Sequence, residues 1–234
     1  KASDSHTLGV MSDKEILFLN AFNAIPGVGA VTLRALRYHF GSYEDAWRAD
    51  AAHYAAAHLE THARTALAMG KSAVDTERAL QRVERAGAWM MTEEDDAYPA
   101  PLKEIHSPPA ILYGRGDQNI FQTTSGISRR SLESRICIAV VGTRRPSPYG
   151  IEATDAVVAG LTRAGVAVIS GLATGIDTKA HKTTLEHGGV TIAVLGSGID
   201  AASLFPPENR TLADRIAASG GAVISEYAPG TPAV

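Results

Sequence analysis

The sequence has a single cysteine, few aromatic residues and no long hydrophobic run. Only 6% of its 234 residues are aromatic, and the one thiol, Cys137, excludes an internal disulfide and a metal site built from several thiolates. No apolar run approaches the roughly 20 residues that a membrane-spanning helix needs, and no secretory signal is apparent. We therefore expect a cytoplasmic protein that has no membrane partner.

Positive charge is also in short supply. The 22 lysines and arginines are outnumbered by 25 aspartates and glutamates, which gives a formal net charge of −3. A protein that coats nucleic acid without sequence preference is usually basic. Any contact with phosphate is therefore expected to be focused on a small part of the surface.

The chain divides into two parts with different hydrophobic patterns. Residues 1–87 contain alanine-rich stretches separated by glycines, which predicts a small all-α domain of short helices. Residues 88–234 are expected to form a second domain. This domain opens with two lead-in strands within the proline-containing residues 88–116, and residues 123–135 are predicted to be a flexible loop.

Beyond residue 135, short apolar runs alternate with segments of helical length. The expected strands are residues 136–141, 166–169, 191–195 and 222–225, and the expected helices are residues 150–164, 175–187 and 207–219. This alternation predicts βαβ crossovers, and hence an α/β fold with a doubly wound, mostly parallel Rossmann-like sheet. Because the runs are continuously apolar, we expect both faces of each strand to be covered and Cys137 to be an inert buried thiol.

The segments that follow three of these strands are rich in glycine, serine and threonine. They are Gly142–Arg145, Ser170–Asp177 and Gly196–Gly198. Ligands bind beyond the carboxyl ends of parallel strands, where glycine lets backbone amides approach an anion and a helix N-terminus favours negative charge. Arg144 can add a forked guanidinium to the same anion. The sequence therefore predicts a phosphate-binding niche at these strand exits.

Other chemistries find little support. The sequence contains neither a P-loop nor a complete dinucleotide-binding fingerprint, and no nucleophile is paired with a base. The histidines at positions 53, 58 and 62 are expected to lie on the surface rather than to bind zinc. Asp177 and His181, four residues apart on a predicted helix, are expected to make a structural hydrogen bond that fixes the loop. We predict no enzyme activity, no catalytic residue, no cofactor and no metal.

A second glycine-rich turn lies in the helical part. Ile25–Gly29 precedes an amphipathic helix that carries Arg34 and Arg37. Helix-hairpin-helix modules present backbone amides to a DNA phosphate in this way, and the two arginines could assist. An ordinary turn between two helices of a bundle explains the same pattern, so both hypotheses stay open.

The strand exits and their surroundings resemble the DNA processing protein A family, called DprA or Smf. The resemblance rests on the segments Val141–Arg145, Tyr149–Gly150, Ser170–His181, Ala193–Asp200, Phe205–Pro206, Asn209 and Gly221–Glu226. Upstream, Tyr98–Ile105 and Pro108–Tyr113 look like the family's lead-in, and Ile25–Ser42 is similar to its SAM-like helical domain.

The resemblance implies a single-stranded DNA-binding protein of natural transformation and recombination. Such a protein protects incoming strands, helps to load the RecA recombinase, and forms a homodimer in its full-length form. The implied phosphate-binding residues are Gly142, Thr143, Arg144, Ser170, Gly171, Ala173, Gly175 and Lys179. The alternative hypothesis is a Rossmann-type enzyme or sensor that acts on a nucleotide monophosphate, and a structural adaptor acting through the helical domain is a third.

Two departures from the family pattern bear on this expectation. Thr174 stands where many relatives have lysine or arginine, and Lys179 is expected to substitute in part for the missing charge. The sequence ends at Val234, before further segments that the family carries, so we expect a truncated chain. Dimerisation and full-strength DNA binding would then depend on the missing part.

Overall fold

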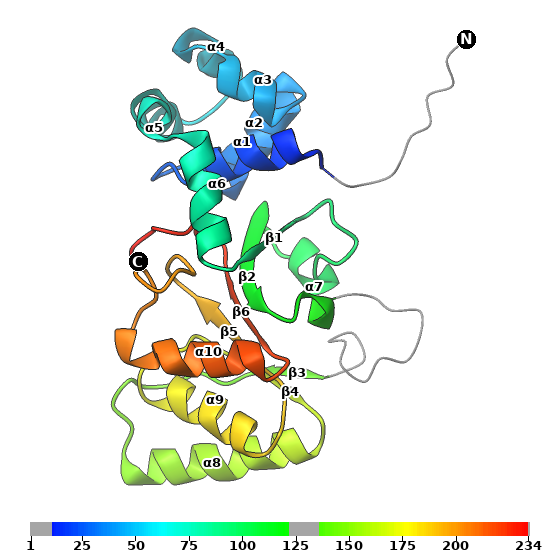
Figure 1. The fold of residues 1–234 in the computed structure, drawn as a ribbon, viewed down its shortest axis with the longest axis vertical. Coiled ribbons are helices and arrows are strands. Elements are labelled where there is room, and N and C mark those ends of the chain that lie inside the picture. The colour runs from blue at the N-terminus through cyan, green and yellow to red at the C-terminus, as the bar shows by residue number, and fades with distance from the viewer. Residues whose placement is uncertain (1–10, 122–135, 234) are drawn as a thin grey trace, which may run out of the picture.

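The computed structural model describes residues 11–121 and 136–233 of the chain (Figure 1). A group of helices lies at one end, and a sheet with three helices packed on it lies at the other (Figure 1). The loop predicted for residues 123–135 lies outside the described residues. Within the described part, no helix is both long and apolar enough to cross a membrane.

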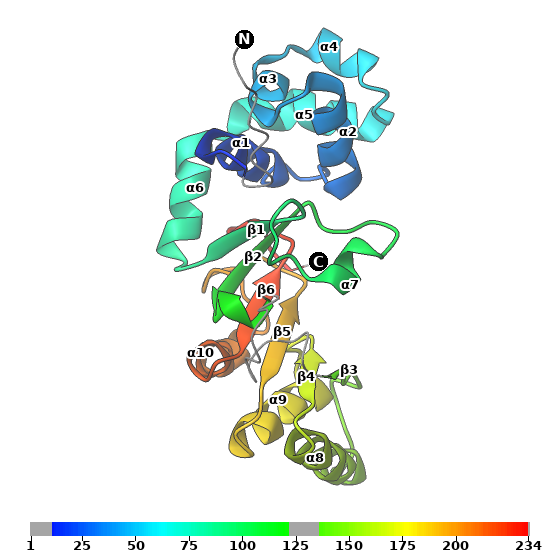
Figure 2. The ribbon, with the colours of Figure 1, turned by 90° about the vertical axis from the view of Figure 1, so that its right-hand side faces the viewer.

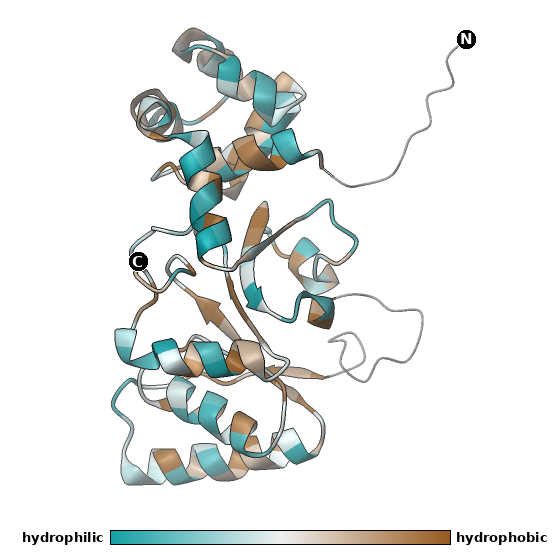
Figure 3. Cartoon of the chain, in the orientation of Figure 1, coloured by the Kyte–Doolittle hydropathy of each residue, from teal (hydrophilic) through white to brown (hydrophobic). Residues whose placement is uncertain are grey.

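The N-terminal part is helical, as the alanine-rich pattern predicts. Its helices are α1 (Asp13–Asn23), α2 (Ala30–Phe40), α3 (Tyr43–Arg48), α4 (Ala51–Ala56), α5 (Thr61–Gly70) and α6 (Thr76–Arg85), with a 3₁₀ turn η1 (Lys71–Ala73). The side chains of Ser12, Ser42 and Asp75 accept hydrogen bonds from backbone amides at the starts of α1, α3 and α6. The residues of α6 are mostly hydrophilic (Figure 3).

A six-stranded mixed sheet follows. Its strands are β1 (Trp89–Thr92), β2 (Ile111–Gly116), β3 (Cys137–Ala139), β4 (Ala167–Ser170), β5 (Thr191–Leu195) and β6 (Ala222–Ser225). They lie in the order β1-β2-β6-β5-β4-β3, and the four strands from β6 to β3 are parallel while β1 and β2 are antiparallel additions. The expected α/β class, with a mostly parallel sheet preceded by an all-helical part, is confirmed.

Helices α8 (Pro148–Arg163), α9 (Ile176–Glu186) and α10 (Arg210–Ala218) connect the parallel strands, and a 3₁₀ turn η4 (Pro207–Asn209) leads into α10. The strands β3 to β6 advance across the sheet in one direction, and right-handed crossovers then place their helices on one face. Accordingly α9 packs between α8 and α10 (Figure 2). The reversal of strand order that creates a switch point does not occur among the described strands.

Side chains of the central strands alternate between two cores. Ala193 and Val223 belong to the core that includes Leu212 and Ile216 of α10. Ile192 and its neighbours pack on the other face, beneath the segment that carries α7 (Ala100–Lys103) and the 3₁₀ turn η2 (Gln118–Phe121). β6 is buried along its whole length, as its continuous apolar run predicts, whereas Val194 of β5 is 44% exposed and departs from the expectation.

The edge strand β3 differs from that expectation. Ile136 is 70% exposed and Val141 75% exposed, and Cys137 between them is also exposed. The prediction of a buried thiol is therefore wrong. The reason is topological, because β3 is the last strand of the described sheet and the same apolar pattern does not reveal which strand lies at an edge.

The helical part and the sheet share buried contacts. One hydrophobic cluster contains Leu19 and Phe22 from α1 as well as Ile111 and Tyr113 from β2. The buried Tyr113 hydroxyl donates to Asn20 Oδ1 at 2.8 Å. The division into domains of residues 1–87 and 88–234 stays a prediction, and the interface between these two parts is packed rather than bridged by a loose linker.

Candidate nucleic-acid interface

The exits of β3 and β4 lie in direct contact. The amide of Ile176, the first residue of α9, donates to Thr143 O at 3.2 Å. A Cβ atom on Gly175 would lie 2.3 Å from the same Thr143 oxygen, and one on Gly142 would lie 2.6 Å from Cγ1 of Ile176. Glycine is also suited to position 175 because its φ is 86°. The close approach of two backbone segments therefore explains both glycines.

Open hydrogen-bond donors gather on the β3 side of this contact. The amides of Gly142, Thr143 and Arg144 have no acceptor within the described part of the chain, and all three residues are exposed. The Arg144 guanidinium has neither a hydrogen bond nor an ion pair to any described residue. The N-cap of α9, Gly175, supplies no side-chain cap. The arrangement offers neutral amides and one full positive charge to an anion.

The β4 exit is built differently, because its donors are used inside the protein. The Asp177 carboxylate, only 6% exposed, accepts from the amides of Gly171 at 3.2 Å and Ala173 at 3.4 Å through Oδ2. The Ser170 hydroxyl donates to Val140 O at 2.6 Å. Ser170, Gly171 and Ala173, which were predicted to contact phosphate, therefore shape the loop. The amides of Gly171 and Ala173 already donate to the Asp177 carboxylate.

Asn209 anchors the same loop from the start of α10. Its side-chain amide donates to Leu172 O at 2.8 Å and to Thr178 Oγ1 at 2.7 Å. Leu172 is fully buried and has a φ of 60°, a conformation that costs a leucine on the order of 1–2 kcal/mol. Asn209 was part of the family pattern, but only the structure reveals that it holds this unusual turn in place.

Lys179 does not point its charge into the open niche. Its ammonium pairs with the Asp155 carboxylate on α8, and Thr183 donates to the same carboxylate. The hydrogen bonds from Lys179 and Thr183 lower the pKa of Asp155 below its ordinary value. Lys179 was expected to substitute in part for the charge missing at Thr174, but a carboxylate on α8 already neutralises it.

His181 is buried and uncharged. Its Nδ1 lies 2.7 Å from Thr191 Oγ1, and that hydroxyl donates to Val168 O, so Nδ1 must carry the proton. Burial lowers the pKa of His181 to about 4. Asp177 and His181 therefore make separate contacts, and of these two residues Asp177 is the one that bonds to the loop.

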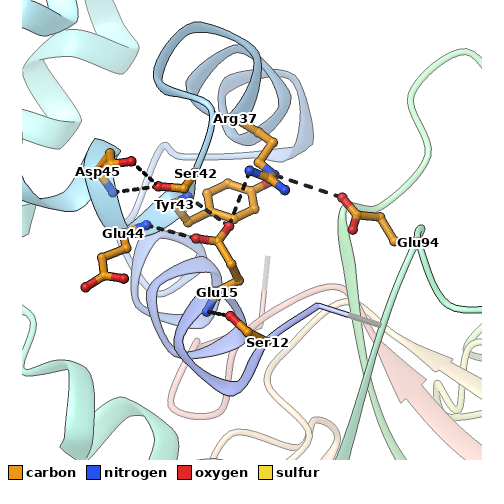
Figure 4. A network of polar contacts seen from close by, with 8 residues as sticks. All are labelled: Ser12, Glu15, Arg37, Ser42, Tyr43, Glu44, Asp45 and Glu94. Atoms are coloured by element: carbon orange, nitrogen blue, oxygen red, sulfur yellow. Dashed lines mark hydrogen bonds and ion pairs between the residues drawn. The ribbon is translucent and has the colours of Figure 1, made fainter. Parts of the chain in front are cut away.

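The glycine-rich turn of the helical part faces the sheet. Arg34 donates to Pro108 O at 2.7 Å and lies 3.3 Å from a Glu93 carboxylate oxygen. Arg37 lies 3.6 Å from Glu15 and 4.0 Å from Glu94 (Figure 4). The acidic run at residues 93–96 supplies carboxylates to both arginines. These arginines hold the two parts of the molecule together.

Phe205 is an exposed aromatic residue that composition did not indicate. The ring belongs to the segment between β5 and η4, four residues before Asn209, and the residue is 54% exposed. An exposed aromatic ring next to exposed cationic groups is a usual element of single-strand binding surfaces. The only signal for it in the sequence was its position in the family pattern.

Comparisons with known proteins agree with one another. The family model described as DNA recombination-mediator protein A matches residues 89–234. Protein Smf of Synechocystis is 33% identical over 223 residues, which is 94% of this chain and 53% of that protein. The chain thus spans about half the length of this curated relative.

Two solved structures are also similar. The X-ray structure of DNA processing protein A from Streptococcus pneumoniae matches with a TM-score of 0.68 and 26% identity, over 96% of this chain and 70% of that one. DNA processing protein A from Helicobacter pylori matches with a TM-score of 0.50 and 27% identity, over 62% of this chain and 59% of that one. The latter structure is described as giving insight into a unique single-stranded DNA binding mode.

Proposed function

Because the chain belongs to the DNA recombination-mediator protein A family, we propose that its β3 and β4 exits bind the sugar–phosphate backbone of single-stranded DNA. The observation that carries the proposal is the environment of Arg144. Its guanidinium has no carboxylate partner within the described residues, and it follows two exposed amides that have no acceptor there. A phosphodiester satisfies all of these donors at once.

The openness of the site favours a polymer over a small substrate. Gly142–Arg145 and Thr174 are all exposed, so they form an edge rather than a cavity. A backbone can continue past such an edge in both directions, whereas an enzyme that acts on a mononucleotide needs a concave pocket that excludes water. The proposal therefore contains binding and no catalysis.

Each of the predicted contact residues has a part in this proposal. Gly142, Thr143, Arg144 and Gly175 contact phosphate, while Ser170, Gly171 and Ala173 keep the loop in shape for them. Lys179 contributes weakly, since Asp155 already neutralises it. Phe205 adds a platform on which a base stacks, which is worth roughly 1–3 kcal/mol for a single strand.

The family supports a wider role. We propose that the protein acts in the cytoplasm during natural transformation and recombination, where it protects incoming single strands and helps to load RecA. The description of the family as recombination mediators supports this role, and the similarity to a DNA processing protein with a described single-strand binding mode supports the ligand. A homodimer of the complete protein belongs to the same proposal.

Fluorescence anisotropy with labelled oligo-dT and with mixed-sequence single strands tests the ligand. We expect Arg144→Ala to weaken both about tenfold, because a backbone contact does not depend on the base. Arg163→Ala is a matched control, since Arg163 is an exposed arginine at the C-terminal end of α8. Equal affinities of wild type and Arg144→Ala, or turnover of a nucleotide monophosphate without strand binding, would overturn the proposal.

A further inference from the structure

We propose that a hollow between α6, β2 and α10 binds a second phosphate of the same DNA strand. This inference rests on the function proposed above. The hollow has a volume of about 460 Å³, and its charged lining residues are Arg82, Arg85, Arg115, Asp200 and Asp214. Nothing in the strand-exit site uses these residues.

The three arginines come from two elements that approach each other. Arg82 and Arg85 are exposed residues on one side of the last turn of α6, and that turn is hydrophilic in Figure 3. Arg115 lies on β2 with a side chain that is 21% exposed. Gly230 lets Arg82 come close, because a Cβ atom there would be 3.2 Å from its Nη1.

The hollow has unbalanced positive charge. Arg115 pairs with Asp214 of α10, whereas neither Arg82 nor Arg85 has a carboxylate partner within the described chain. The carboxylate of Asp200 is already engaged by the amides of Gly230 at 2.7 Å and Ser203 at 3.2 Å. Three arginines against two aspartates leave one positive charge. Arg85 donates to the neutral Gln81 Oε1 at 3.5 Å, and no described carboxylate neutralises Arg82 or Arg85.

The position of the hollow connects it with the first site. Its rim consists of Asp200–Ala202, which come after β5, and of Gly230, which comes after β6. Both segments therefore lie beyond the carboxyl ends of strands, as do the exits of β3 and β4. In Figure 1 the N-terminal ends of α8 and α10 lie on the left of the view, and α6 lies above α10. From β3, whose exit carries Arg144, to β6 is three strand spacings, about 14 Å, which a few nucleotides can cover.

An acidic polypeptide is the other occupant with suitable charge. DNA is favoured because both sites lie beyond the carboxyl ends of the strands. A backbone that is held at Arg144 and follows these strand ends passes the exits of β5 and β6. Single-strand binding surfaces of this kind are grooves with positive charge along the path of the backbone.

The test compares a double variant, Arg82→Ala with Arg85→Ala, against wild type on two strands. The short strand is the dithymidine dinucleotide, whose single phosphodiester cannot occupy both sites, and the long strand is oligo-dT of about 20 nucleotides, longer than the site sizes of single-strand binding folds. We expect the long strand to bind about tenfold more weakly and the short strand to change less than twofold. Arg78→Ala is the matched control, because Arg78 lies on the same helix, pairs with Asp75 and does not line the hollow. Poly-glutamate provides a competitor of the other class.

Unchanged binding of the long strand by the double variant would overturn the inference, as would equal weakening of both lengths or an equal loss in Arg78→Ala. Loss of poly-glutamate binding alone would assign the hollow to an acidic polypeptide. If Arg144→Ala weakens binding and the double variant does not, only this inference fails. If the wild type binds neither strand, the proposed function itself fails.

Discussion

The molecule contains two glycine-rich turns that are followed by arginines, and it uses them in different ways. At Ile25–Gly29 the following arginines, Arg34 and Arg37, meet carboxylates of the sheet part. At Gly142 the following Arg144 meets no carboxylate among the described residues. A glycine-rich turn followed by arginines is therefore a candidate phosphate site only if the fold leaves the arginines without a carboxylate partner.

The backbone differs between the two turns as well. A Cβ atom on Gly175 would meet the Thr143 oxygen at 2.3 Å, whereas the nearest atom to one on Gly27 is a methyl group, Cβ of Ala66, at 3.3 Å. Both glycines have a positive φ, 86° and 85°. A side chain at position 175 would therefore require the backbone to move, whereas one at position 27 would require only a small shift of Ala66.

Gly175→Ala is expected to have the largest effect. The clash with Thr143 O has to separate the two exits, so we expect DNA binding to be lost and the free energy of unfolding to fall by about 2–4 kcal/mol. Gly27→Ala is the matched change in the hairpin and is expected to cost about 1 kcal/mol while DNA binding persists. Urea unfolding and anisotropy measure both quantities. Equal losses of binding in the two variants would show that the turns do not differ.

Stability should depend on pH through His181, which is buried against Thr191 at the start of β5. Its pKa is about 4 in the folded protein against 6.5 unfolded, so the unfolded state binds more protons between these values. Stability is complete above pH 6.5, falls as the pH is lowered towards 4 and loses about 3 kcal/mol in total, of which about 1.4 kcal/mol is lost by pH 5.5.

Urea unfolding at pH 7 and pH 5.5 checks this dependence, and His181→Gln provides the control because it cannot titrate. We expect the difference between the two pH values to shrink in the variant. The same difference in wild type and His181→Gln would assign the effect to another group.

Thr174 allows the charge of the strand exit to be changed in both directions. Thr174→Glu supplies the carboxylate that Arg144 lacks, so Arg144 would be paired as Arg34 and Arg37 are. We expect strand binding to weaken about tenfold. Thr174→Lys adds a cation and should tighten binding severalfold. Anisotropy at low salt measures both variants. Affinities that move together, or not at all, would contradict a phosphate site beside this residue.

Removing the partners of the hairpin arginines should have the smallest effect. Glu93→Gln combined with Glu94→Gln breaks two half-exposed ion pairs, so we expect a loss of about 0.5–1 kcal/mol in unfolding free energy. DNA affinity should rise less than twofold, since Arg34 stays bonded to Pro108 O. A large gain in affinity would mean that the hairpin is a DNA site held closed by the acidic run.

Local sequence predicts most of the fold for a simple reason. β5 and β6 cover the expected residues 191–195 and 222–225, and β6 begins and ends with its apolar run because Gly221 and Glu226 flank it. The exposure of Cys137 was missed because a strand's place in a sheet depends on strand order, which its own residues do not encode.

The candidate site shows the same division. Glycine at positions 142 and 175, and Arg144 beside them, were recognisable from composition and spacing. The occupation of the Gly171 and Ala173 amides by Asp177 and the pairing of Lys179 with Asp155 were not. Such contacts depend on how a loop turns and how two helices pack, and many arrangements are compatible with the same residues.

The salt dependence of strand binding reports directly whether Arg144 contacts a phosphate. The logarithm of the binding constant falls linearly with the logarithm of salt concentration, with a slope of about −0.7 for each single-strand phosphate contact. We predict that Arg144→Ala reduces the magnitude of this slope by about 0.7 and that Arg34→Ala leaves it unchanged. An unchanged slope in Arg144→Ala, or a reduced slope in Arg34→Ala, would contradict the account.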